Sequence, residues 1–185
     1  MKKYEVEVKY RVADFERLET RLSELGAVPL PENYQCDTYF QHPARNFAET
    51  DEALRIRQST DGLFVTCKGP KIDAETKTRH EIEFSIGESD ADKTQFAELL
   101  DALDFAVVAD VEKRRREFKL MRDGQLYKIA LDTVNKAGCF VELETECTGS
   151  ELAAGQEAIK HLAEQLNLTD SIRTSYLEMI LNPDV

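Results

Sequence analysis

The chain has 185 residues, 42% of them hydrophobic, so it is long enough to bury the core of one domain and is not disordered by composition. Its 24 Lys and Arg residues stand against 36 Asp and Glu residues, which gives a formal net charge of −12. A surface this negative repels nucleic acid and anionic lipid, so neither is an expected partner, and an anionic small ligand would need a local basic pocket.

The N-terminal stretch and the cysteines bear on the compartment. Residues 1–10 contain no apolar signal-peptide core, and no run approaches the roughly 18 apolar residues of a membrane-spanning helix. The four cysteines form no CxxC pair, and the histidines show no zinc-type spacing. These features predict a reduced cytoplasmic protein without a membrane segment, with Cys67 and Cys139 as small core residues.

In chain order, alternating strand-like segments are interrupted by amphipathic helices. Strands are expected at 4–11, 54–58, 63–68, 79–86, 111–119, 127–133 and 139–146, and helices at 14–25, 89–103, 151–166 and 175–181. Asp14 is placed to cap the first helix, and Gly26 suits its end. The pairs Asp61-Gly62 and Asp123-Gly124 predict hairpin turns, and the polar stretch 71–78 predicts a mobile loop. Because no linker or repeat is evident, residues 1–185 are expected to form a single domain.

Charged residues occupy one face of nearly every expected strand, opposite apolar residues on the other face. An ordinary sheet with one solvated face is the usual meaning of such alternation. Here, however, the charge is sorted, because acids concentrate on the first and last strands while Arg and Lys dominate the strands at 54–58, 63–68 and 111–119. Since amphipathic helices are available to cover the apolar face, we expect the charged face to line the inside of a closed barrel.

Two Glu-x-Glu pairs suggest chemistry for such an interior. Residues i and i+2 of a strand face the same way, so Glu5 with Glu7, and Glu142 with Glu144, each direct two carboxylates into one space. Clustered carboxylates repel one another unless cations join them, and oxygen ligands favour Mg²⁺ or Mn²⁺. Metal ions beside a basic cradle are typical of phosphoryl or nucleotidyl transfer.

An ordered set of motifs along the chain carries a family resemblance. The motifs are EVEVK at 5–9, DTYF at 37–40, LRIR at 54–57, TCKGP at 66–70, RHEIE at 79–83, KRR at 113–115, LD at 131–132, GCFVELE at 138–144 and SYL at 175–177. In this order they resemble the CYTH family, also called triphosphate tunnel metalloenzymes, and most of all its class IV (CyaB-type) adenylate cyclases. The resemblance covers nearly the whole chain.

The resemblance implies an α+β fold, a closed eight-stranded antiparallel β-barrel or tunnel with a charged interior and helices packed outside. It implies metal ligation by Glu5, Glu7, Asp132, Glu142 and Glu144, and triphosphate binding by Lys9, Arg55, Arg57, Lys68, Lys113 and Arg115. Glu81 and Glu83 match supporting tunnel acids. Because the run 113–116 does not alternate cleanly, Arg114 and Arg116 are expected to point outward, although a bulge would exchange them with Arg115.

The activity implied first is the conversion of ATP to cyclic AMP and pyrophosphate, with catalysis resting on Glu7, Tyr39, Lys113 and Asp132. A triphosphatase acting on inorganic or thiamine triphosphate is the alternative, with Tyr39 and Lys113 as a base pair. A non-catalytic polyphosphate-binding or nucleotide-binding module is a third reading, and a structural sheet protein a fourth. The cyclase-like relatives also imply a homodimer, and the motifs separate neither Mg²⁺ from Mn²⁺ nor cyclase from hydrolase.

Overall fold

The computed structural model describes residues 3–70 and 79–183, so the loop expected at 71–78 lies outside the described residues. The strands are β1 (Lys3–Arg11), β2 (Val28–Pro29), β3 (Asn33–Gln41), β4 (Ala53–Ser59), β5 (Gly62–Lys68), β6 (Arg79–Gly87), β7 (Ala106–Arg122), β8 (Gln125–Val134) and β9 (Gly138–Thr148). The helices are α1 (Glu16–Glu24), α2 (Phe47–Thr50), α3 (Asp90–Ala102), the 3₁₀ turn η1 (Gly149–Glu151), α4 (Leu152–Gln165) and α5 (Tyr176–Leu181).

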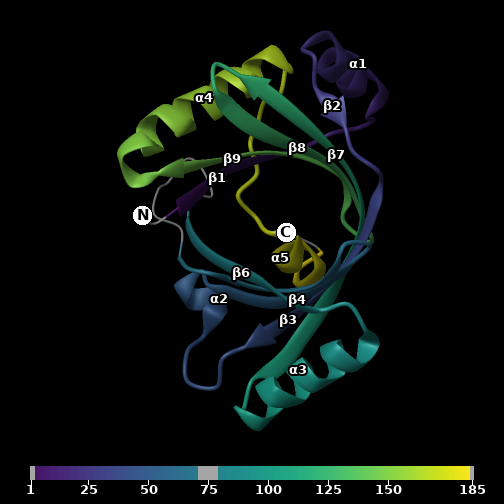
Figure 1. Ribbon diagram of the computed structural model, residues 1–185, viewed down its shortest axis with the longest axis vertical. Helices are drawn as coiled ribbons and strands as arrows, with labels where there is room; N and C mark the ends of the chain where they lie inside the picture. The colour runs from purple at the N-terminus through teal and green to yellow at the C-terminus, as the bar shows by residue number, and fades with distance from the viewer. Residues whose placement is uncertain (1–2, 71–78, 184–185) are drawn as a thin grey trace.

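The strands close into an antiparallel barrel. Following the hydrogen-bonded neighbours gives the order β7-β3-β4-β5-β6-β1-β9-β8, and the β7–β8 pairing joins the ends of this series. The short β2 adds to the far half of β7. Figure 1 shows the strands as a ring, with α4 outside β1 and β9, α3 on the opposite side, and α5 within the ring. The expected eight-stranded barrel with helices packed outside is confirmed, and α5 is the helix that lies inside it.

Period-two alternation explains why these segments form strands with distinct faces. In β1 the buried Val6, Val8 and Tyr10 pack outward, so the charged residues between them face the interior. The β7–β8 hairpin turns at Asp123 and Gly124, whose φ angles of 51° and 78° are left-handed, as a two-residue Asp-Gly turn requires. β3 was missing from the expected strands, because its polar–apolar alternation is interrupted at Thr38, Tyr39 and Phe40.

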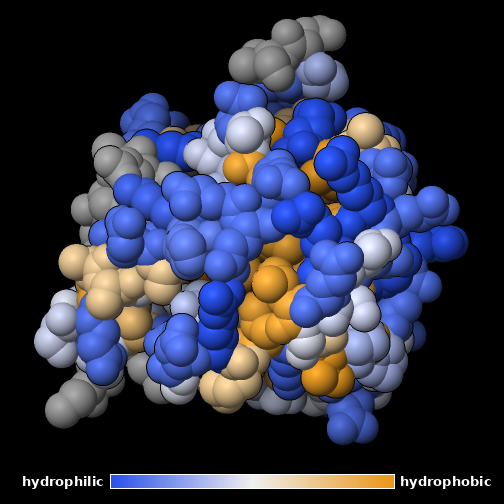
Figure 2. Space-filling view, turned by 90° about the horizontal axis from the view of Figure 1, so that it is seen from above, coloured by the Kyte–Doolittle hydropathy of each residue, from blue (hydrophilic) through white to orange (hydrophobic). Residues whose placement is uncertain are grey.

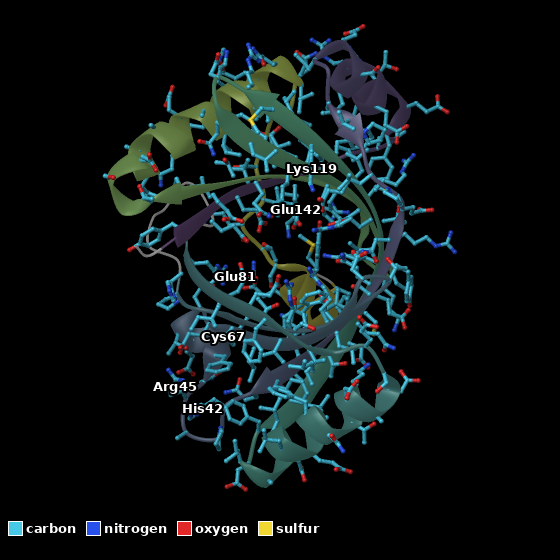
Figure 3. The ribbon with its side chains drawn as sticks, viewed as in Figure 1. His42, Arg45, Cys67, Glu81, Lys119 and Glu142 are labelled. Atoms are coloured by element: carbon cyan, nitrogen blue, oxygen red, sulfur yellow. The ribbon has the colours of Figure 1, made fainter. Side chains whose placement is uncertain are left out.

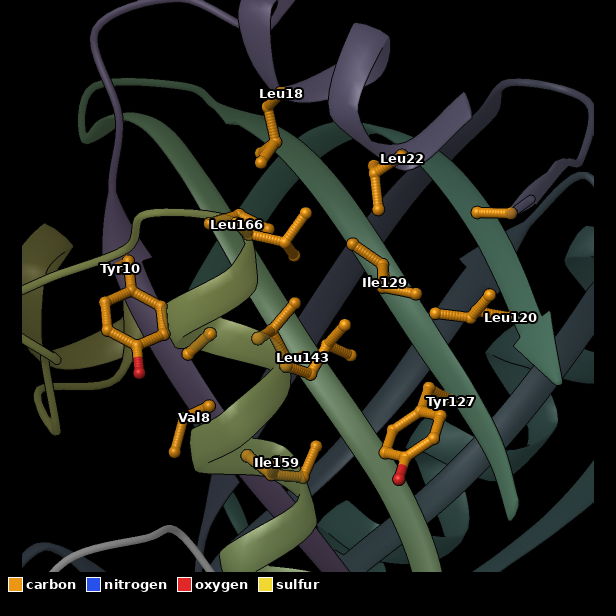
Figure 4. Packing of buried hydrophobic residues seen from close by; sticks show 14 of the residues in the cluster. Val8, Tyr10, Leu18, Leu22, Leu120, Tyr127, Ile129, Leu143, Ile159 and Leu166 are labelled. Carbon is orange, nitrogen blue, oxygen red and sulfur yellow. The ribbon is translucent and has the colours of Figure 1, made fainter. Parts of the chain in front are cut away.

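Two apolar clusters fix the helices on the outside of the barrel. Figure 4 shows Leu18 and Leu22 of α1 and Ile159 of α4 meeting Ile129 and Leu143 of the sheet, all of them buried. Burying each such side chain stabilises the fold by about 1.5–3 kcal/mol. A second cluster forms where Leu100 of α3 packs over β3, β4 and β5, so both walls are held from outside and the interior remains polar.

The helix starts follow local capping chemistry. Ser89 and Asp92 form a capping box at α3, and Ser175 with Glu178 does the same at α5, as their sequences favour. At α1 the helix begins at Glu16, and Asp14 accepts a hydrogen bond from the Glu16 N–H at 2.8 Å. Each of the four expected helices is present, and its ends lie within two residues of the expected bounds.

All four cysteines are free thiols. The expectation that Cys67 and Cys139 are core residues was wrong, since both are half-buried, and Cys147 is the buried one. Its side chain lies against Gly155 of α4, where a Cβ would approach Sγ to 3.3 Å. Within the described residues, no helix is both long and apolar enough to cross a membrane. Figure 2 shows a mainly hydrophilic face with one hydrophobic area near its middle.

Candidate active site inside the barrel

The charged face of the strands lines a cavity of about 420 Å³. Its walls bring together residues from both halves of the sequence, and Figure 3 shows the labelled Glu81 and Glu142 on facing sides of the ring of strands. The predicted site residues that line it are Glu5, Glu7, Lys9, Tyr39, Arg55, Arg57, Lys68, Glu81, Glu83, Lys113, Arg115, Glu142 and Glu144. A cavity of this volume is in the range of small-molecule sites.

A buried carboxylate holds two of the arginines. Asp37 of β3 accepts two hydrogen bonds of 2.7 Å from Arg57, through Nε and Nη2, and one of 3.2 Å from Arg55 Nη1. Burial opposes ionisation of this carboxyl, but the two guanidiniums outweigh it and hold the pKa of Asp37 well below its usual range. Asp37 is therefore an anion throughout the neutral pH range.

A second buried carboxylate anchors β7. Asp132 has no exposed surface, and it accepts hydrogen bonds from Arg115 at 2.7 and 2.6 Å and from the Tyr176 hydroxyl at 3.0 Å. Arg115 also reaches Glu142 at 2.6 Å. This settles the register of the run 113–116, since Arg116 pairs on the outside with Glu19 of α1 and Arg114 is exposed. The expected orientation of all three arginines is confirmed.

Lys113 lies between these two anchors. Its Nζ is 3.8 Å from Asp132, and its side chain is almost fully buried. Burial, reinforced by the nearby Arg115, lowers the pKa of Lys113 to about 7. By contrast, the pKa of Lys68 is raised despite burial, because the carboxylates of Glu5 and Glu81 lie 2.9 and 2.7 Å from its Nζ and favour the charged form. Lys113 is thus poised to exchange a proton near neutral pH.

The C-terminal segment closes part of the interior. Lys9 donates from Nζ to the carbonyl of Thr174 and lies 4.1 Å from the centre of the Tyr176 ring, while its own carbonyl accepts from Ile172 N–H at 2.7 Å. Tyr176 begins α5, which sits within the ring in Figure 1. One end of the site is therefore built from residues more than 160 positions apart, as the 165-residue separation of Lys9 and Thr174 illustrates.

The acidic residues face one another across β1 and β9. Glu7 lies directly opposite Glu144 in the ladder, a like-charge pair that destabilises a sheet unless cations compensate it. Lys128 reaches Glu144 at 2.9 Å. Even so, burial and the charge of Glu5 raise the pKa of Glu144 to about 7. No group of three His, Cys, Asp or Glu within residues 3–70 and 79–183 is arranged to hold a metal.

Sequence reasoning missed several interior residues that the structure brings in. Asp37, Lys128 and Lys119 had a usable signal, since each keeps the inward phase of a predicted residue on its own strand. The expected pair of Tyr39 and Lys113 is spread along the β3–β7 ladder. Lys113 lies opposite Gln35. Gln35 is four residues from Tyr39 along β3, so the backbone positions of Lys113 and Tyr39 are offset by roughly 13 Å along the strands. Tyr39 contacts Arg55 instead, at 3.5 Å.

Fold and site together define a closed barrel that gathers basic and acidic side chains around an internal cavity. The CYTH domain family matches residues 3–176, and the chain belongs to this family. A Methanocaldococcus jannaschii protein, provisionally named an adenylate cyclase, is 36% identical over 178 residues, which covers 95% of this chain and 97% of that protein.

Two further relatives agree. Adenylate cyclase CyaB of Aeromonas hydrophila is 28% identical over 173 residues, covering 91% of this chain and 83% of that protein. The solved structure of a protein from Pyrococcus horikoshii superposes with a TM-score of 0.84 at 35% identity, covering 97% of this chain and 99% of that one. Sequence similarity therefore supports the family, and the superposition on a solved structure supports the fold.

Proposed function

We propose that the chain is a class IV adenylate cyclase-like enzyme that converts ATP to cyclic AMP and pyrophosphate inside the barrel. The observation that carries this proposal is the cavity of about 420 Å³, where oriented guanidiniums lie across from a carboxylate pair. Membership of the CYTH family and the names of the two curated relatives support it.

The basic residues would bind the triphosphate with guanidiniums that carboxylates already hold in place. Arg55, Arg57 and Arg115 already make charge-assisted hydrogen bonds to carboxylates, and guanidiniums match phosphate oxygens in the same forked geometry. Lys68 bridges Glu5 and Glu81, so phosphate oxygens would compete with those acids for its ammonium. The triphosphate would therefore enter a site whose donors are oriented before it arrives.

The four carboxylates Glu5, Glu7, Glu142 and Glu144 fit a hard divalent cation by donor type and charge. Their oxygens are the ligands that Mg²⁺ and Mn²⁺ prefer, and a bound cation would offset both the burial and the nearby Glu5 charge that raise the pKa of Glu144. When bound, such an ion would neutralise phosphate charge and acidify the attacking hydroxyl. The contacts of Asp132 favour a different role from the predicted metal ligand, namely orienting Arg115.

Lys113 is the proposed proton acceptor. In the cyclase reaction the ribose 3′-oxygen forms a bond to the α-phosphorus, the bond to the bridging oxygen of the β-phosphate breaks, and pyrophosphate leaves. The proton of the 3′-hydroxyl passes to Nζ of Lys113, which is neutral in half of the molecules near pH 7. Tyr39 is proposed to hold Arg55 rather than to act on Lys113 directly.

Product analysis tests the proposal. The protein is incubated with ATP and, separately, with inorganic triphosphate, each with Mg²⁺ or Mn²⁺, and the products are resolved by chromatography. Cyclic AMP with pyrophosphate is expected. Orthophosphate from inorganic triphosphate with ATP untouched would make the chain a triphosphatase, and binding without any product would leave a non-catalytic module. The homodimer and the cytoplasmic location stay predictions.

A further inference from the structure

We propose that Asp37 is a positioning residue of this site, which locks Arg55 and Arg57 into one rigid pair of donors aimed at the triphosphate. The inference rests on the proposed function and deepens it. Asp37 binds no phosphate in this scheme, because an anion repels one; it acts through the two arginines.

The contacts of Asp37 are those of a brace. Arg57 makes a forked interaction, with Nε on one carboxylate oxygen and Nη2 on the other, both at 2.7 Å. Arg55 adds a third bond at 3.2 Å to the same oxygen that receives Nη2 of Arg57. Both guanidinium planes are therefore fixed relative to one carboxylate that is only 1% exposed.

Further contacts complete the bracing of Arg55. Its Nε lies 3.3 Å from Thr66 Oγ1, and that hydroxyl in turn donates to Glu83 at 2.8 Å. The Tyr39 hydroxyl lies 3.5 Å from its Nη1. Arg55 is thus held from β3 and from β5, while the forked bond to Asp37 orients Arg57 from β3.

Strand register makes this arrangement specific. Asp37 lies directly opposite Arg57 in the β3–β4 ladder, and Tyr39, the next inward residue of β3, lies opposite Arg55. Two positions earlier on the same face, Gln35 lies opposite Ser59 and not opposite an arginine, and a slip by one residue would turn the carboxylate out of the barrel. The neighbouring Thr38 does face outward, where it bonds Asp110 at 2.7 Å.

A buried acid in an anion site weakens the attraction for a triphosphate, so its presence needs a compensating benefit. The benefit inferred here is order, since long arginine side chains lose rotamer freedom before the ligand arrives. Removing the carboxylate charge would raise the net charge of the cavity by one while releasing the arginines. Binding of the triphosphate in the ground state would therefore hold or tighten, whereas alignment in the transition state would be lost.

The test compares Asp37→Asn with the wild type and with Asp110→Asn, the same chemical change on the outer face of the adjacent strand. Turnover is measured on whichever triphosphate the wild type converts, and the affinity for inorganic triphosphate is measured by calorimetry without metal. The expected result is a kcat at least tenfold lower, with a Kd that is unchanged within twofold or tighter; Asp110→Asn leaves both as in the wild type. A kcat within twofold of the wild type, or a Kd weakened in parallel with kcat, overturns the proposal.

A second variant guards against misfolding of Asp37→Asn. Arg57→Lys keeps the charge and the Asp37 carboxylate but removes the fork, so it should reproduce the loss of kcat. The double variant should then have a kcat no lower than that of the weaker single variant, because both substitutions break the same Asp37–Arg57 fork. Additive losses of kcat contradict the inference. If the wild type converts no triphosphate, the proposed function itself fails, an outcome distinct from a wild type that works and an Asp37→Asn variant that works equally well.

Discussion

Replacing Lys113 with methionine should stabilise the protein at neutral pH. The ammonium is buried between Asp132 and two arginines, and its pKa is lowered to about 7 from 10.5. Between these two values the unfolded chain binds more protons than the folded chain, so wild-type stability from this group rises with pH. At pH 7 the lowered pKa of Lys113 reduces the free energy of unfolding by roughly 4 kcal/mol. Methionine carries no charge, so the variant does not have this loss.

The assay is urea unfolding of both proteins at several pH values between 7 and 10. The variant should be more stable by roughly 4 kcal/mol at pH 7, and the gap should narrow by up to about 1.4 kcal/mol per pH unit and close only above about pH 10.5. Lys136→Met, at an exposed position in the β8–β9 turn, provides the control and should show no such trend. A variant less stable than the wild type at pH 7, or a gap that ignores pH, would refute the reasoning. The same variant should lose turnover, because its side chain accepts no proton.

Three more outcomes are expected. Glu142→Gln should abolish metal-dependent turnover, measured by product formation, whereas Glu98→Gln on the outer face of α3 should not; full activity of the former would remove Glu142 from the metal site. Arg57→Ala should weaken the binding of inorganic triphosphate in calorimetry by roughly 1.5–3 kcal/mol, the value of hydrogen bonds to a charged group, and an unchanged Kd would place this arginine outside the phosphate site. Mn²⁺ affinity should rise about tenfold per pH unit below pH 7 and level off above it, because Glu144, whose pKa is raised to about 7, must lose its proton first; a flat titration would contradict this.

Alternation was enough to predict the inward residues of most strands. A period of two fixes the face of every residue once one is known, and the buried Val6 and Val8 determine that Glu5, Glu7 and Lys9 face inward. The same logic predicted that Arg114 and Arg116 point outward. These parts of the fold depend only on neighbours along one strand, which a sequence displays directly.

What failed depends on neighbours across strands. Asp37 meets Arg57 only through the β3–β4 register, and the alternation that would reveal β3 as a strand is interrupted at Thr38, Tyr39 and Phe40. Tyr39 and Lys113 share the same two adjacent strands yet lie four residues apart along them, a stagger that composition cannot express. The partnership of Asp132 with Tyr176 likewise joins the barrel to a helix 44 residues further on.

The strand β7 imposes a limit on how this site can respond to a ligand. Its 17 residues pair with β2, β3 and β8, so the backbone that carries Lys113 and Arg115 is hydrogen-bonded along both edges and also closes the ring. Shifting that backbone toward a ligand would break ladders on two sides at once. Adjustment of the donors on β7 is therefore confined to side-chain torsions, and the proposed site would discriminate among anions by how their charges are spaced relative to these fixed donors.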